Sequence, residues 1–142
     1  MKPLARVPAS PTRLALVPAA ATAVVYFPHL VTDAGQTASV PPPLAWMWLA
    51  LLLVTAPAIA WVLNSHDPRV AIGPRQVLLV GMPQLIVAVV MVRLDVWLEV
   101  RSGYLLAGSG EEAMAYGIGT VLGVIGGSVL AILVALSARV GH

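Results

Sequence analysis

The densest group of residues that could do chemistry lies in one short stretch, residues 92–101 (VRLDVWLEVR). Its charged residues alternate with aliphatic ones, and we call these four the outer polar patch: Arg93, Asp95, Glu99 and Arg101. Two carboxylates and two guanidinium groups this close could pair with one another or bind a charged partner or substrate. The equal numbers of the two signs favour mutual pairing at a solvated helix end, with contact to a partner or substrate as the alternative.

Gln84 is the most polar residue inside any apolar stretch, and it directly follows Pro83. Its amide could form a hydrogen bond between helices, worth about 1 kcal/mol, or contact a polar solute. A proline removes a backbone hydrogen bond and can kink a helix, which transporters use to build sites near the bilayer midplane. Because proline is also common in membrane helices for packing reasons alone, a packing contact is the favoured interpretation of Gln84.

Residue types that bind metals or act as nucleophiles are scarce and scattered. The three histidines, His29, His66 and His142, lie far apart, and the Asp67 next to His66 leaves too few ligands for a metal. There is no cysteine, which excludes disulfides and thiolate sites. The apolar stretches hold no carboxylate or lysine of the kind that proton-coupled transport needs, and their one histidine, His29, lies at the outer end of the first. We therefore expect no enzyme activity, no cofactor and no metal.

Composition sets the class of protein. Only 10% of the 142 residues are charged and 59% are hydrophobic, with a mean hydropathy of +0.91. A soluble domain carries about 25% charged residues. A net charge of +2 is also too small to attract a nucleic acid. The sequence thus predicts one integral membrane domain over residues 1–142, in contact with membrane lipid and with no nucleic-acid partner.

Stretches without Asp, Glu, Lys or Arg mark the expected membrane spans. A helix needs about 20 apolar residues to cross the hydrocarbon, with a range of about 17–25. The sequence predicts an all-α membrane protein with four transmembrane helices over approximately 14–31, 44–63, 76–98 and 110–138. The third apolar stretch is too short by itself, so its helix is expected to continue to about Leu98. The alternation after it also fits a β-strand, but a lone strand would leave unpaired edges that lipid does not tolerate.

Basic residues indicate the orientation of these helices. Six of the eight lie before the first span, between the second and third, or after the fourth: Lys2, Arg6, Arg13, Arg69, Arg75 and Arg139. Such residues stay on the cytoplasmic side, so both termini are expected to be cytoplasmic. The alternative for residues 1–34 is a secretory signal that is cleaved, which would leave three spans in the same orientation. Pro18 and Asp33 argue against cleavage.

Small residues line one side of the fourth span, in what we call the glycine strip: Gly119, Gly123, Gly127 and Ala131. A spacing of four places them on one helix face, where two helix backbones can approach closely. Their partner could be another helix of this chain or a helix of another copy or protein. At the start of the same span, Ser109 and Glu112 have the spacing of a capping box, and Glu111 suits the positive end of the helix dipole.

Two function classes remain. The favoured one is a non-catalytic accessory, assembly or self-associating subunit of a membrane complex, whose partner is a second copy or another membrane protein. The alternative is a passive pore or facilitator for a small solute, with Gln84 and the glycine strip along its path. Seven arginines against one lysine suggest the coding bias of a GC-rich bacterium, and hence the cytoplasmic membrane of the cell as the compartment.

Overall fold

Four helices make up the part of the chain that the computed structural model describes, residues 11–33, 42–65 and 74–140. Their bounds are α1 Pro11–Asp33, α2 Pro42–Ser65, α3 Pro74–Arg101 and α4 Gly110–Val140. No strand occurs in these residues, so the all-α class is confirmed. Each helix begins and ends within three residues of the expected position. α3 runs through residues 92–101 as a helix, to Arg101 and not to about Leu98.

Three of the helices are long and apolar enough to cross a membrane. Their apolar segments are Pro11–Leu30, Leu78–Arg101 and Gly110–Ala138, and the described apolar segment of α2 is shorter, Leu49–Asn64. The chain is therefore a multi-pass membrane protein. α1, α2 and α3 each begin at a proline, because the first turn of a helix has no acceptor for its N–H groups and proline lacks that group.

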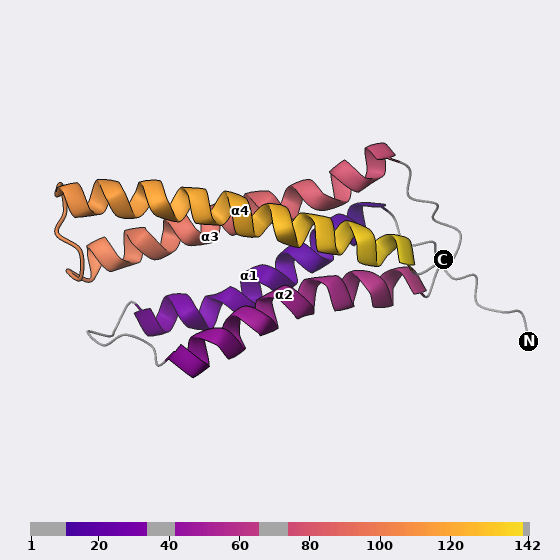
Figure 1. Cartoon of the computed structure of the whole chain (residues 1–142), viewed down its shortest axis with the longest axis horizontal. Helices are drawn as coiled ribbons and strands as arrows, with labels where there is room; N and C mark the ends of the chain where they lie inside the picture. Colours follow the sequence, from indigo (N-terminus) through magenta and orange to yellow (C-terminus); the bar gives the residue numbers. More distant parts are fainter. Residues whose placement is uncertain (1–10, 34–41, 66–73, 141–142) are drawn as a thin grey trace, which may run out of the picture.

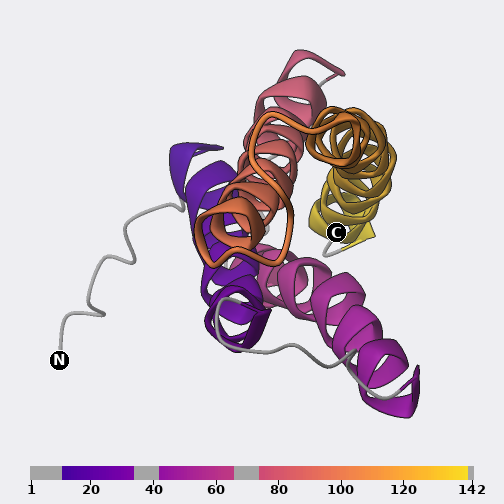
Figure 2. The same ribbon diagram turned by 90° about the vertical axis from the view of Figure 1, so that its left-hand side faces the viewer.

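The helices pack in the cyclic order α1, α3, α4, α2. α3 and α4 form a long hairpin, and α1 and α2 lie along one side of it (Figure 1). The hairpin's connection, residues 102–109, defines one end of the bundle, which we call the turn end. Figure 2 is viewed from that end and shows that α2 diverges there from α3 and α4.

The buried apolar core lies at the end opposite the turn end. Six fully buried side chains form the core there, and most are small: Leu14, Ala56, Ala60, Val80, Val134 and Ala138. Lipid is as apolar as leucine, so helices in a membrane are held together by close packing more than by hydrophobic burial. Small side chains allow that close approach, which explains why α2 meets α1 and α4 at this end and separates from the hairpin at the other.

The connection between α3 and α4 has well-defined caps. Gly103 has φ +82° after the last turn of α3, a left-handed conformation that favours glycine. At the start of α4, the Glu112 N–H donates to the Ser109 hydroxyl at 3.2 Å, as expected for a capping box. In a usual capping box the Glu112 carboxylate would accept from the N–H of the cap residue, Ser109. Here it accepts from the N–H of Gly108, one residue earlier.

Candidate functional site

The outer polar patch is divided between two sides of α3. Asp95 accepts a hydrogen bond from the Tyr26 hydroxyl of α1 at 3.2 Å. Arg93 donates to the Thr120 hydroxyl of α4 at 3.1 Å and lies 5.0 Å from the centre of the Tyr116 ring. Arg101 lies over the Trp97 ring, 5.7 Å from its centre. Three of the four patch residues therefore contact residues outside the patch.

Helix geometry accounts for this division. Residues two positions apart in an α-helix point roughly 200° apart around its axis, nearly in opposite directions. Arg93 and Asp95 have that spacing, and so do Glu99 and Arg101. The strand-like alternation of the sequence therefore becomes, in a helix, a separation of acidic from basic residues. We call the surface around Arg93, Trp97 and Arg101 the basic side.

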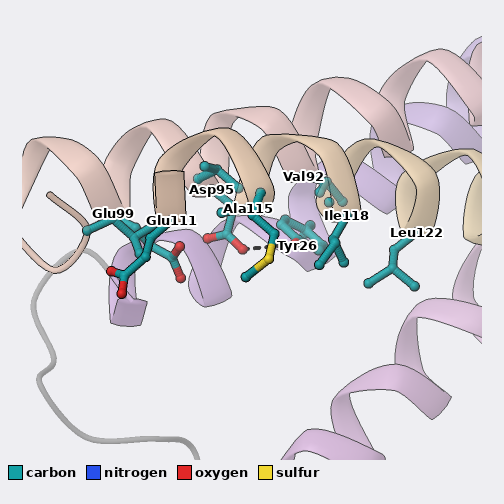
Figure 3. Close-up of a pocket in the computed structure, with 12 residues that line it drawn as sticks. Tyr26, Val92, Asp95, Glu99, Glu111, Ala115, Ile118 and Leu122 are labelled. Atoms are coloured by element: carbon teal, nitrogen blue, oxygen red, sulfur yellow. Dashed lines mark hydrogen bonds between the residues drawn. The ribbon is translucent and has the colours of Figure 1, made fainter. Parts of the chain in front are cut away.

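A pocket of about 550 Å³ lies on the other side, between α1, α3 and α4 near the turn end. We call it the acidic pocket, because three carboxylates line it, those of Asp95, Glu99 and Glu111, and none of its lining residues is Lys, Arg or His. In Figure 3 the Glu99 and Glu111 carboxylates point into the same space, while Asp95 points toward Tyr26. The pocket is wide open to its surroundings.

The remainder of the acidic pocket is apolar. Met114, Ile118 and Leu122 form one wall along α4, and each is more than half exposed. Val92 and Val96 of α3 also line the pocket. Carboxylates beside an exposed apolar wall can hold a cationic group whose surroundings are themselves apolar. Such a group can belong to a small molecule or to the side of another membrane helix.

Gln84 lies where α1 and α3 cross. Its side chain is fully buried, and its Oε1 accepts a hydrogen bond from the Thr22 hydroxyl at 2.9 Å. The same hydroxyl also lies 3.1 Å from the Pro18 carbonyl oxygen. The Gln84 Nε2 atom is buried with no hydrogen-bond partner among the described residues. The amide is thus in contact with α1 of the same chain and not with solvent.

The glycine strip of α4 faces α3. A Cβ atom added at Gly127 would lie 2.9 Å from the Leu85 Cα, and one added at Gly123 would lie 3.2 Å from the Val89 Cα. Gly119 meets a Val92 methyl group in the same way. At Ala131, the last residue of the glycine strip, the glycine of the contact is on α3 instead, because the Ala131 side chain packs against Gly81. The closest approach of the two backbones in the hairpin therefore depends on these positions.

Sequence analysis did not single out three polar residues that join distant helices: Tyr26, Thr22 and Asn64. Asn64, fully buried at the end of α2, donates its amide to the Ala138 carbonyl in the last turn of α4. That carbonyl is among the last of α4, which a helix leaves without an internal partner. Each of these contacts joins residues more than 60 positions apart, so no local pattern in the sequence indicates it.

Among the described residues, no group of three or more His, Asp or Glu side chains is arranged to hold a metal ion. The ring of His29 instead packs against that of Tyr26, with 5.3 Å between the centroids. Comparison with protein-family models, with curated proteins and with solved structures gave no significant match. The acidic pocket and the basic side are therefore the two features from which a function can be inferred.

Proposed function

We propose that this protein is a non-catalytic subunit of a membrane assembly and that it associates through the turn end of its bundle. The observation that carries the proposal is the acidic pocket, with three carboxylates beside an apolar wall that no described segment of the chain covers. Apolar side chains facing lipid need no protein partner. An acidic surface at the edge of the hydrocarbon, in contrast, attracts cationic groups, because charges interact more strongly where water is scarce.

The structure offers less support to a passive pore. Such a path was expected to use Gln84 and the glycine strip. The Gln84 side chain is fully buried against α1, and Gly119, Gly123 and Gly127 meet atoms of α3 within 3.2 Å of an added Cβ. These positions fill helix contacts, so we propose association and not conduction.

The orientation follows from the basic residues. We propose that the turn end faces outward and that both termini lie on the cytoplasmic side of the cell membrane, with Arg75 at the start of α3 also inside. The acidic pocket would then open near the outer interface. Asp95 lies about 9 Å from Arg101 along the axis of α3, within reach of that interface.

The proposal can be tested with a photo-crosslinking residue at Ile118, which lines the pocket. The matched control is Val121, three residues away, which is exposed to a similar degree and is not a pocket residue. We expect illumination of the protein in its native membrane to join Ile118, but not Val121, to a protein. Adducts with lipid alone at both positions would overturn the proposal.

A further inference from the structure

We infer that the partner at the acidic pocket is the basic side of a second copy of this chain. This inference depends on the proposed function and names its partner. The α3–α4 hairpin carries three carboxylates on one side, of which Glu99 and Glu111 point into the pocket and Asp95 points toward Tyr26 (Figure 3). It carries two guanidinium groups on the other side, those of Arg93 and Arg101. One hairpin thus carries both halves of a charge-complementary pair.

The two surfaces lie at the same depth. Glu99 and Arg101 are two positions apart near the end of α3, and Glu111 is in the first turn of α4, directly across the connection. Copies inserted with the same orientation present corresponding residues at the same level of the bilayer. The basic side of one copy can therefore reach the acidic pocket of its neighbour without a vertical shift.

The uncharged parts of the two surfaces also match. On the basic side, Trp97 is about half exposed beneath the Arg101 guanidinium, and Arg93 lies on the Tyr116 ring. Cations seated on aromatic rings remain available for a further contact with a carboxylate. The opposing surface is the apolar wall of Met114, Ile118 and Leu122, against which an aromatic side chain can pack.

This contact has a consequence for the size of the assembly. It joins two different surfaces of the same chain, so each copy bound to a neighbour still has one surface of each kind available. Contacts of this type produce closed rings or open chains, not two-fold dimers. We therefore expect assemblies of three or more copies.

Charge reversal gives a direct test. The first variant, Glu99→Lys with Glu111→Lys, reverses the charge of the acidic pocket. The second, Arg93→Glu with Arg101→Glu, reverses the charge of the basic side. Association is measured by energy transfer between copies in liposomes, labelled at His142→Cys, since the natural sequence has no cysteine. We expect each variant alone to associate at least about tenfold more weakly than the starting protein.

The decisive sample is a mixture of the two variants. Each then offers the surface that the other needs, so energy transfer is expected to return, which a folding defect could not produce. Neutral substitutions, Glu99→Gln with Glu111→Gln, should weaken association without charge repulsion. Arg75→Glu, at the opposite end of the bundle, is the control for net charge and should leave association unchanged.

Three outcomes would overturn the inference: unchanged association of both reversed variants, no recovery in the mixture, or a starting protein that is monomeric in liposomes. In the last case two further results separate this inference from the proposed function. Crosslinking of Ile118 to a different protein keeps the proposed function and assigns the pocket to that protein. Saturable binding of tetraphenylphosphonium, lost in Glu99→Gln with Glu111→Gln, assigns it to a small organic cation.

Discussion

The Thr22 hydroxyl and the Gln84 side-chain oxygen are 2.9 Å apart, although the two residues are separated by 62 positions in the chain. Thr22 is nearly fully buried and Gln84 fully so. The pair joins the first and third helices where proline interrupts the backbone hydrogen bonding of each, since Pro18 and Pro83 lie close by in sequence. A buried polar pair of this kind determines how the two helices are rotated toward each other.

The Thr22–Gln84 pair should show energetic coupling. Thr22→Val alone should lower the free energy of unfolding by about 1–2 kcal/mol, because the buried Gln84 oxygen loses its donor. In a Gln84→Met background the same change should cost much less, since no polar atom is then left unpaired. Titration with a denaturing detergent measures both, and we expect a coupling energy of about 1 kcal/mol. Equal costs in the two backgrounds would contradict the contact.

The glycine strip allows a comparison between neighbouring positions. Gly127→Ala should destabilise the protein by about 1–3 kcal/mol, because the added methyl group would meet the α3 backbone at 2.9 Å. Gly126→Ala adds the same group where nothing lies within 4 Å, and should be neutral or stabilising by up to about 1 kcal/mol. Thermal unfolding in mild detergent compares them. Similar losses for both variants would show that α3 does not pack on this strip.

Asn64 should be intolerant of a carboxylate. Asn64→Asp keeps the shape of the side chain but removes the amide donor, and it places a negative group against the Ala138 carbonyl at the negative end of α4. We expect a loss of about 1–3 kcal/mol in the same unfolding measurement. The control on the same helix is Thr55→Val, because the Thr55 hydroxyl bonds only the backbone of its own helix in the described structure. This change should alter the free energy of unfolding by no more than about 0.5 kcal/mol. Equal costs for both would contradict a bridge between α2 and α4.

Orientation can be measured by labelling single cysteines in intact cells with a reagent that does not cross membranes. Ser102 follows the last residue of α3 at the turn end, and Arg75 lies at the start of the same helix; both are exposed. Ser102→Cys should react from outside and Arg75→Cys only after the membrane is opened. The reverse pattern would show that the cytoplasmic placement of the termini is wrong.

Helix positions could be predicted from the sequence because lipid requires each span to satisfy its own backbone hydrogen bonds. A continuous apolar run of about 20 residues satisfies them within itself only as a helix, and the thickness of the bilayer sets its length. This reasoning placed all four helices to within three residues and made residues 92–98 helical despite their strand-like alternation. The cap of α4 at Ser109 is equally local, and it too was predictable.

Only the tertiary structure decided which side of each helix meets which neighbour. Tyr26 and Asp95 are 69 positions apart, and Asn64 and Ala138 are 74 apart. Their contacts depend on how the helices are rotated and crossed, and nothing nearby in the sequence encodes that. Local helix geometry put the acidic and basic residues of the outer polar patch on opposite sides of α3, and the packing of α1 and α4 then enclosed the acidic side as a pocket. Local spacing determines where a residue lies around its own helix, whereas packing of whole helices determines what that residue faces.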